Sequence, residues 1–380
     1  MKNHLIIKIC LGLLGWQIAS TSLAHPRFYS SSAKLKSSPA NCKSLIHAIL
    51  VKDMIKVKKL LKTVPVNCID PHPNRRKVAG LYKAGAYYLE DPETPWGAAA
   101  QTGDVAIGQL LVQAGAQIRF QGPDDPPALF IAAAFGHLEY VKYLLGLGLS
   151  PTQTTPNQGT PLIAAAYRGR TSVVKYLLSQ GARLHFTTSN QGNALIAAAT
   201  NGHIETIRFL LEKGAKINQI SPNQGNPLIV AANNGHTQTV KLLLEKGAKI
   251  NQISPNQGSP LIVAANNGHT ETIRLLLEKG AKINQLSPNQ GSPLIVAANN
   301  GYTETIRLLL EKGAKINQIS PNHGSPLIVA ANNGHTQTVK LLLEKGADPY
   351  VAGVDGRNAL EIARKSGNQR IIKLLRKYTK

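Results

Sequence analysis

Residues 258–290 read GSPLIVAANNGHTETIRLLLEKGAKINQLSPNQ, and this stretch decides the fold. Ser259 is a good cap for a helix that begins at Pro260 and runs for barely two turns. Thr270 is the expected cap of a second helix, whose apolar residues three and four positions apart share one face, and Gly280 ends that helix. The remaining residues, which include a proline and other turn formers, predict an extended finger that bends back toward the next unit.

The unit repeats along the chain with a period of 33 residues. The glycine of an Asn-Gln-Gly or Asn-His-Gly triplet recurs at Gly159, Gly192, Gly225, Gly258, Gly291 and Gly324. Helices shorter than about 12 residues are not stable alone in water, so the units must stack and bury one another. The small residues Ala264 and Ala265 allow helices of neighbouring units to approach closely.

The same register extends beyond these copies. Trp96 and Leu129 stand 66 and 33 residues before Leu162, Leu360 continues the register with one residue deleted, and a first copy around Leu45 requires an insertion of 18 residues. The sequence therefore predicts ten units. The expected organisation is a signal peptide at 1–24, a linker at 25–40, an atypical first repeat at 41–74, an inserted loop at 75–92, a repeat array at 93–355 and a C-terminal capping repeat at 356–380.

A unit of 33 residues with Gly-(Ser/Thr)-Pro-Leu, Ala-Ala, Gly-His and Leu-Leu-Leu-Glu-Lys-Gly-Ala resembles the ankyrin repeat family. The resemblance covers roughly 340 residues and implies an all-α solenoid of helix-turn-helix units with extended β-turn fingers. The chain departs from the family pattern at two positions. Isoleucine replaces the usual histidine after Pro-Leu, as at Ile262, so the finger is expected to be held more by packing. Lysine replaces the usual aspartate after Gly-Ala, as at Lys282, which makes the finger base basic.

The first residues have the features of an export signal. Lys2 and Lys8 precede an apolar run from Ile9 to Ala19, and a site with small residues follows, so cleavage after Ala24 is expected. An uncleaved anchor is the alternative, although the run is shorter than the roughly 20 residues that span a bilayer. We therefore expect an exported chain that ends in the periplasm or outside the cell, with no transmembrane segment after cleavage.

Cys42 and Cys68 remain after such cleavage and form an expected disulfide. Cys42 stands just before the first helix of the first unit, and Cys68 stands just after the second. Because the two helices are antiparallel, these two positions should meet on one side of the unit. Two free cysteines are the alternative.

The sequence carries no catalytic motif and predicts no enzyme, cofactor or metal site. His-Glu-x-x-His, Gly-x-x-x-x-Gly-Lys-Ser/Thr and Gly-x-Ser-x-Gly are all absent from the 380 residues. Histidines do recur after the first helix, as at His236 and His269. Stacked units lie about 8 to 10 Å apart, whereas ligands of one zinc lie about 2 Å from it, so these histidines are interpreted as turn residues.

Paired asparagines at the end of the first helix are the better binding candidates. The pairs are Asn233 and Asn234, Asn266 and Asn267, Asn299 and Asn300, and Asn332 and Asn333. The resemblance implies that they face the concave groove where ankyrin repeats commonly contact ligand. Asparagine also caps helix carbonyls, so a purely structural ladder remains open.

The expected inserted loop mixes basic and aromatic residues, namely Arg75, Arg76, Tyr82, Tyr87 and Tyr88. Such mixtures bind partners, and insertions in solenoids tend to map to a binding face, but the tyrosines could equally pack the loop on its own unit. Nucleic acid is not an expected partner of an exported protein.

The formal net charge of +23 is concentrated at the two ends of the chain. Residues 25–92 hold 13 basic and 4 acidic side chains, and residues 356–380 hold 8 and 1. The basic last unit is either the solvated outer face of a capping repeat or a contact for an anionic surface.

The composition of 43% apolar and 17% charged residues excludes a disordered chain. Taken together, the sequence predicts a monomeric, exported module of bacterial type that binds an unidentified protein through helix tips and fingers, possibly in a host cell. A structural or chaperone-like envelope protein is the alternative.

Overall fold

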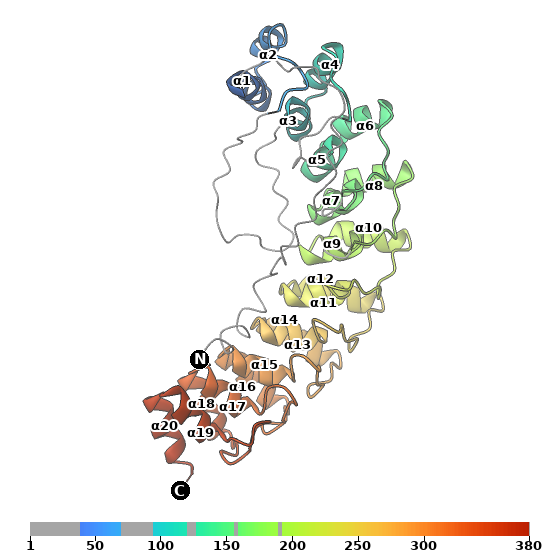
Figure 1. Cartoon of the computed structure of the whole chain (residues 1–380). Helices are drawn as coiled ribbons and strands as arrows, with labels where there is room; N and C mark the ends of the chain where they lie inside the picture. Colours follow the sequence, from blue (N-terminus) through green and yellow to red (C-terminus); the bar gives the residue numbers. More distant parts are fainter. Residues whose placement is uncertain (1–38, 70–93, 120–126, 156–158, 189–191, 380) are drawn as a thin grey trace.

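The computed structural model describes residues 39–69, 94–119, 127–155, 159–188 and 192–379. These residues form 20 helices, which follow one another as ten pairs along one curved stack (Figure 1). The helices are α1 (Pro39–Leu50), α2 (Met54–Leu60), α3 (Pro95–Thr102), α4 (Val105–Gln113), α5 (Ala128–Phe135), α6 (Leu138–Gly146), α7 (Pro161–Tyr167), α8 (Thr171–Ser179), α9 (Ala194–Thr200), α10 (Ile204–Glu212), α11 (Pro227–Asn233), α12 (Thr237–Glu245), α13 (Pro260–Asn266), α14 (Thr270–Glu278), α15 (Pro293–Asn299), α16 (Thr303–Glu311), α17 (Pro326–Asn332), α18 (Thr336–Glu344), α19 (Ala359–Ser366) and α20 (Gln369–Arg376). The predicted all-α solenoid of ten units is confirmed.

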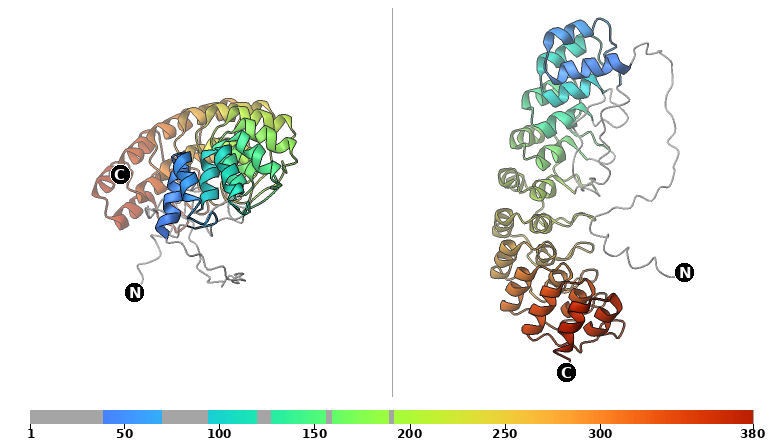
Figure 2. Two further views of the ribbon diagram at one scale, coloured as in Figure 1. Left: turned by 90° about the horizontal axis from the view of Figure 1, so that it is seen from above. Right: turned by 90° about the vertical axis from the view of Figure 1, so that its left-hand side faces the viewer.

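Two layers of helices make up the stack. The first helix of each pair packs on the first helix of the next pair, and the second helices pack on each other in the same way. Between α5 and α10 the first helices lie on the concave side of the curve (Figure 1). The views in Figure 2 show the same single stack from above and from the side.

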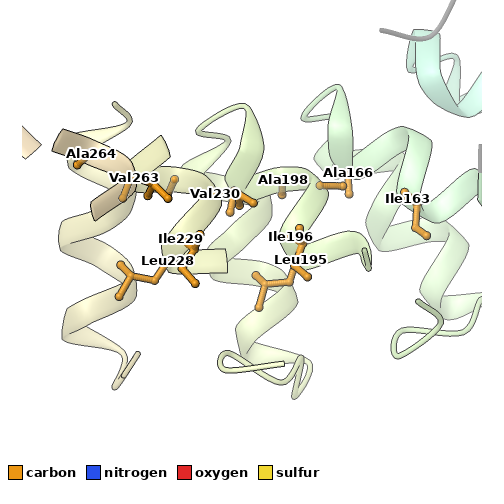
Figure 3. Packing of buried hydrophobic residues seen from close by; sticks show 14 of the residues in the cluster. Ile163, Ala166, Leu195, Ile196, Ala198, Leu228, Ile229, Val230, Val263 and Ala264 are labelled. Atoms are coloured by element: carbon orange, nitrogen blue, oxygen red, sulfur yellow. The ribbon is translucent and has the colours of Figure 1, made fainter. Parts of the chain in front are cut away.

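The core is one continuous aliphatic layer between the units. Equivalent isoleucines of successive first helices, such as Ile163, Ile196 and Ile229, are at most 1% exposed and follow one another along the stack (Figure 3). Ala264 and Ala265 are fully buried, as expected for small residues where helices approach. Each unit therefore buries its apolar side chains mainly against its neighbours.

The first helix begins as the sequence predicts. A buried Thr, Ser or Asn stands at the N-cap and accepts a hydrogen bond from the third backbone N–H of the helix. In α13 this residue is Ser259, and Pro260 follows as the first helical residue. The helix ends before Gly268, whose φ of 71° lies in the left-handed region that favours glycine.

The predicted cap of the second helix is wrong. Helix α14 begins at Thr270, and His269 occupies the N-cap position without a side-chain cap bond. The hydroxyl of Thr270 instead donates to the carbonyl of Gly268 or pairs with the hydroxyl of Thr305 in the next unit. The threonine therefore serves the contact between units rather than its own helix.

The fingers fold back as predicted. Each of six fingers closes with one isolated antiparallel bridge, between Ser254 and Gly258 in the unit described above. Ile262, which replaces the usual histidine, is fully buried and lies against that glycine. At the start of the chain, α1 begins at Pro39, so the end of the expected linker at residue 40 lies two residues inside this helix.

Candidate interaction surface

The asparagine pairs at the helix tips form a hydrogen-bonded ladder along the stack. Nδ2 of Asn300 donates to the backbone carbonyl of Asn266 at 3.1 Å, to the Oδ1 of Asn266 at 3.0 Å and to the carbonyl of Val296 at 3.1 Å. Asn267 makes the equivalent three bonds to the unit before it. The second asparagine of a pair therefore ties its own helix end to the neighbouring unit.

The ends of this ladder differ from its middle. Asn234 donates only to Val230 in its own helix, at 2.9 Å, because the preceding unit has a threonine where the later units have the first asparagine. Asn333 donates to both oxygens of Asn299, and Asn332 donates to the Oδ1 of Asn333 at 3.4 Å. Most of the amide donors that the sequence analysis offered to a ligand are thus committed within the stack.

The recurring histidines add a second bond at the same level. Nε2 of His269 lies 2.9 Å from the carbonyl of Asn233, and His335 contacts Asn299 in the same way. Because a carbonyl only accepts, Nε2 carries the hydrogen. Burial lowers the pKa of His203, although the bond from its Nε2 to the carbonyl of Tyr167 acts in the opposite direction. The histidines therefore link units, and within the described residues no three His, Cys, Asp or Glu side chains gather to hold a metal.

The fingers carry a further ladder that the sequence analysis did not predict. Oδ1 of Asn251 accepts the backbone N–H of Lys282 at 2.8 Å, and Nε2 of Gln285 donates to the carbonyl of Asn251 at 3.2 Å. At the finger tip, Nδ2 of Asn289 donates to the carbonyl of Pro255 at 3.1 Å. The same bonds recur in the neighbouring units. The repetition of Asn-Gln and Pro-Asn at a period of 33 was the available signal.

These bonds hold an apolar row on the outside of four consecutive fingers. We call it the finger strip; it consists of Ile220, Pro222, Ile253, Pro255, Leu286, Pro288, Ile319 and Pro321. Ile220 and Leu286 are 37% exposed and Ile319 is 46% exposed, whereas the serine that follows each of them is buried. The alternation is that of an extended chain, in which successive side chains face opposite sides.

The finger strip lies in segments without any charged residue. Residues 217–235, 250–268, 283–301 and 316–334, which comprise the fingers and the first helices, contain no Asp, Glu, Lys or Arg. The charges of these units lie on the second helices and at the finger base. A chain with a net charge of +23 thus has an uncharged face across four units.

The last unit has the opposite character. Its exposed basic side chains are Arg364, Lys365, Arg370, Lys373, Arg376 and Lys377. Glu361, the single acidic residue after position 355, accepts a hydrogen bond from the backbone N–H of Asn358 in a capping box. The structure is compatible with both interpretations of this unit, the solvated cap and the anionic contact.

The structure pairs Cys42 with Cys68 as a disulfide, with the two Cα atoms 5.8 Å apart. Both residues are buried, and they join the start of α1 to the segment after α2, where the sequence analysis expected them to meet. Asn67 beside this bond accepts the backbone N–H of Gln117 at 2.9 Å. The first unit thus shares one finger bond with the array.

Several predicted features lie outside the described residues. These are the signal peptide at 1–24, most of the linker, Arg75, Arg76, Tyr82, Tyr87 and Tyr88. Among the helices that are described, none is long and apolar enough to cross a bilayer.

Ten stacked pairs of short helices with folded-back fingers define the chain as a repeat solenoid of the helix-turn-helix-finger type. The family model for ankyrin repeats, in three copies, matches residues 96–188, 129–221, 162–254, 228–320 and 294–380. The chain belongs to the ankyrin repeat family.

Comparison with solved structures gives the same result. The crystal structure of the human ASB11 ankyrin repeat domain is similar to this chain, with a TM-score of 0.51 and 32% sequence identity. The match covers 57% of this chain and 97% of the human domain. A search of curated protein sequences finds no match. Ankyrin repeats generally mediate contacts between proteins and are typically not enzymes.

Proposed function

We propose that this chain is an exported module that binds a protein partner through the fingers and the tips of the first helices. The observation that supports this proposal is the uncharged face that four units present in the same register. Its residues are held by hydrogen bonds between units, so that little conformational freedom remains to be lost when a partner binds. An exported location follows from the signal-like residues before Ala24 and not from the fold.

Two experiments test the proposal separately. Affinity capture with the full chain, from periplasmic and host-cell extracts, should retain a specific protein. A matched bait with Asn266→Ala and Asn299→Ala changes the uncharged face while it retains the bonds that Asn267 and Asn300 make to backbone carbonyls. Retention that is equal for both baits would remove the helix tips from the binding surface.

Export is tested by N-terminal sequencing of the protein recovered outside the cytoplasm. Cleavage after Ala24 gives a chain that begins at His25. A recovered chain that still begins at Met1 would contradict the expected signal. Delivery to a host cell requires that the same cleaved chain appear in the host fraction, whereas retention in the periplasm would favour the structural or chaperone-like alternative.

A further inference from the structure

The finger strip is an apolar row without a partner in the described structure. Ile220, Leu286 and Ile319 are among the few large apolar side chains that are more than one third exposed in the described residues. They recur every 33 residues, and a proline stands two positions after each of them. Four units therefore present the same apolar pair of residues four times.

The chemistry around the finger strip favours apolar contact over hydrogen bonding. The amide donors of the fingers are committed: Nε2 of Gln257 donates to Asn223 at 3.0 Å and Nδ2 of Asn256 donates to Pro222 at 3.1 Å. A polar ligand such as a neutral sugar polymer would have to replace these bonds. No charged residue lies in the segments that carry the finger strip, so a charged ligand segment would lose hydration without gaining an ion pair.

The spacing of the fingers restricts the conformation of the ligand. One asparagine side chain bridges from each finger to the backbone of the finger before it, which limits the spacing of their backbones to about 9 Å. Three residues of a polyproline II helix advance about 9.3 Å and return a side chain to the same face. Seven residues of an α-helix advance about 10.5 Å, and two or four residues of a strand advance about 7 or 13 Å. Only the polyproline II repeat keeps register over four fingers.

We propose that the finger strip binds an extended, uncharged segment of a protein partner in polyproline II conformation, with an aliphatic residue at every third position. This inference rests on the proposed function and names the chemistry of the partner segment. Each aliphatic side chain of the segment lies over one finger, against the Ile or Leu and the Pro of that finger. The near-identity of the four units matches a ligand that itself repeats.

The test uses an 18-residue peptide of six Leu-Pro-Gln repeats as the probe, with a fluorophore at one end and the full chain as the receptor. A control peptide of the same composition has its leucines at irregular spacing. The repeating peptide should bind about tenfold more tightly, because only it places every leucine over a finger. Equal affinities would overturn the inference, as would tighter binding of a helical peptide with leucine at every seventh position or displacement by a neutral polysaccharide.

Variants of the chain locate the contact. The double variant Ile253→Ser and Leu286→Ser should weaken binding of the repeating peptide by about tenfold. The matched control, Val51→Ser and Ile55→Ser, removes two exposed aliphatic side chains at the α1–α2 end and should leave binding unchanged. Equal losses in both double variants would overturn the inference. An unchanged urea midpoint in each variant shows that its fold is retained.

The capture experiment separates this inference from the proposed function. A captured protein that binds the Ile253→Ser and Leu286→Ser chain as tightly as the original chain would refute the finger strip as the contact while the interaction module stands. Loss of that protein together with loss of the peptide supports both proposals.

Discussion

The first unit, α1–α2, and the four units that carry the finger strip hold equally short helices in different ways. The four later units are joined by asparagine, histidine and glutamine side chains that reach the preceding unit, with the same bonds at each interface. The first unit has a described neighbour on one side only, keeps one such bond through Asn67, and carries the disulfide. Where neighbours are missing, a covalent bond supplies the constraint that stacking supplies elsewhere.

The largest expected effect comes from breaking that covalent bond. The variant Cys42→Ser and Cys68→Ser should destabilise the first unit by about 3.5 kcal/mol, because the disulfide closes a loop of 26 residues. Hydrogen exchange should accelerate for the amides of α1 and α2 and remain unchanged for α13 to α16. Reductant should reproduce the effect in the original chain and do nothing to the variant. Two reactive thiols in the denatured, unreduced and cleaved protein would rule the bond out.

A smaller effect distinguishes units inside the array. Nδ2 of Asn226 donates to the Oε1 of Gln252 at 2.9 Å, in addition to the cap bond. Ser259 at the same position of the next unit makes only the cap bond, and the buried Oε1 of Gln285 has no partner. Asn226→Ser should therefore lower the free energy of unfolding by about 1.5 kcal/mol, and Ser259→Asn should raise it by about 1 kcal/mol. Urea midpoints measure both changes, and a loss of stability in Ser259→Asn would contradict this explanation.

The asparagine ladder contains its own control. Asn300→Ala removes bonds to two units and should cost about 1 kcal/mol, whereas Asn234→Ala removes one bond within its own helix and should cost about half of that. Both residues occupy the same position of the unit, so that differences in helix propensity cancel. Equal shifts of the urea midpoint would show that the bonds between units contribute nothing measurable.

The smallest effect is a dependence on pH. Burial lowers the pKa of His203 below its ordinary value of 6.5, so the unfolded chain binds the proton more readily than the folded chain. The stability that the neutral histidine contributes is complete above pH 6.5 and is lost as the pH falls below that value. His203→Gln removes this group but retains an N–H that can donate to the carbonyl of Tyr167. The variant should lose less stability than the original chain between pH 7.5 and 5, and identical pH profiles would refute this assignment.

The sequence was sufficient to predict the solenoid, because the 33-residue period, the caps and the apolar positions of each helix all favour the same unit. It did not predict which polar side chains would bridge between units. Thr270 could cap its own helix or bond to the next unit, and its local sequence is the same in both cases. The asparagine pairs were ambiguous for the same reason, since the acceptors of Asn300 lie 34 and 4 positions away. The finger strip was missed because its exposure depends on how the fingers pack.

The bridging bonds run in one direction along the chain, from each unit to the unit before it. Each 33-residue copy therefore carries the donors for the interface on one side and the acceptors for the interface on the other. A whole copy can be gained or lost by recombination within the gene without leaving an unmatched interface, whereas a partial copy would leave one. The length of the binding face can thus change in evolution in steps of one finger, each step adding one more contact for a repetitive ligand.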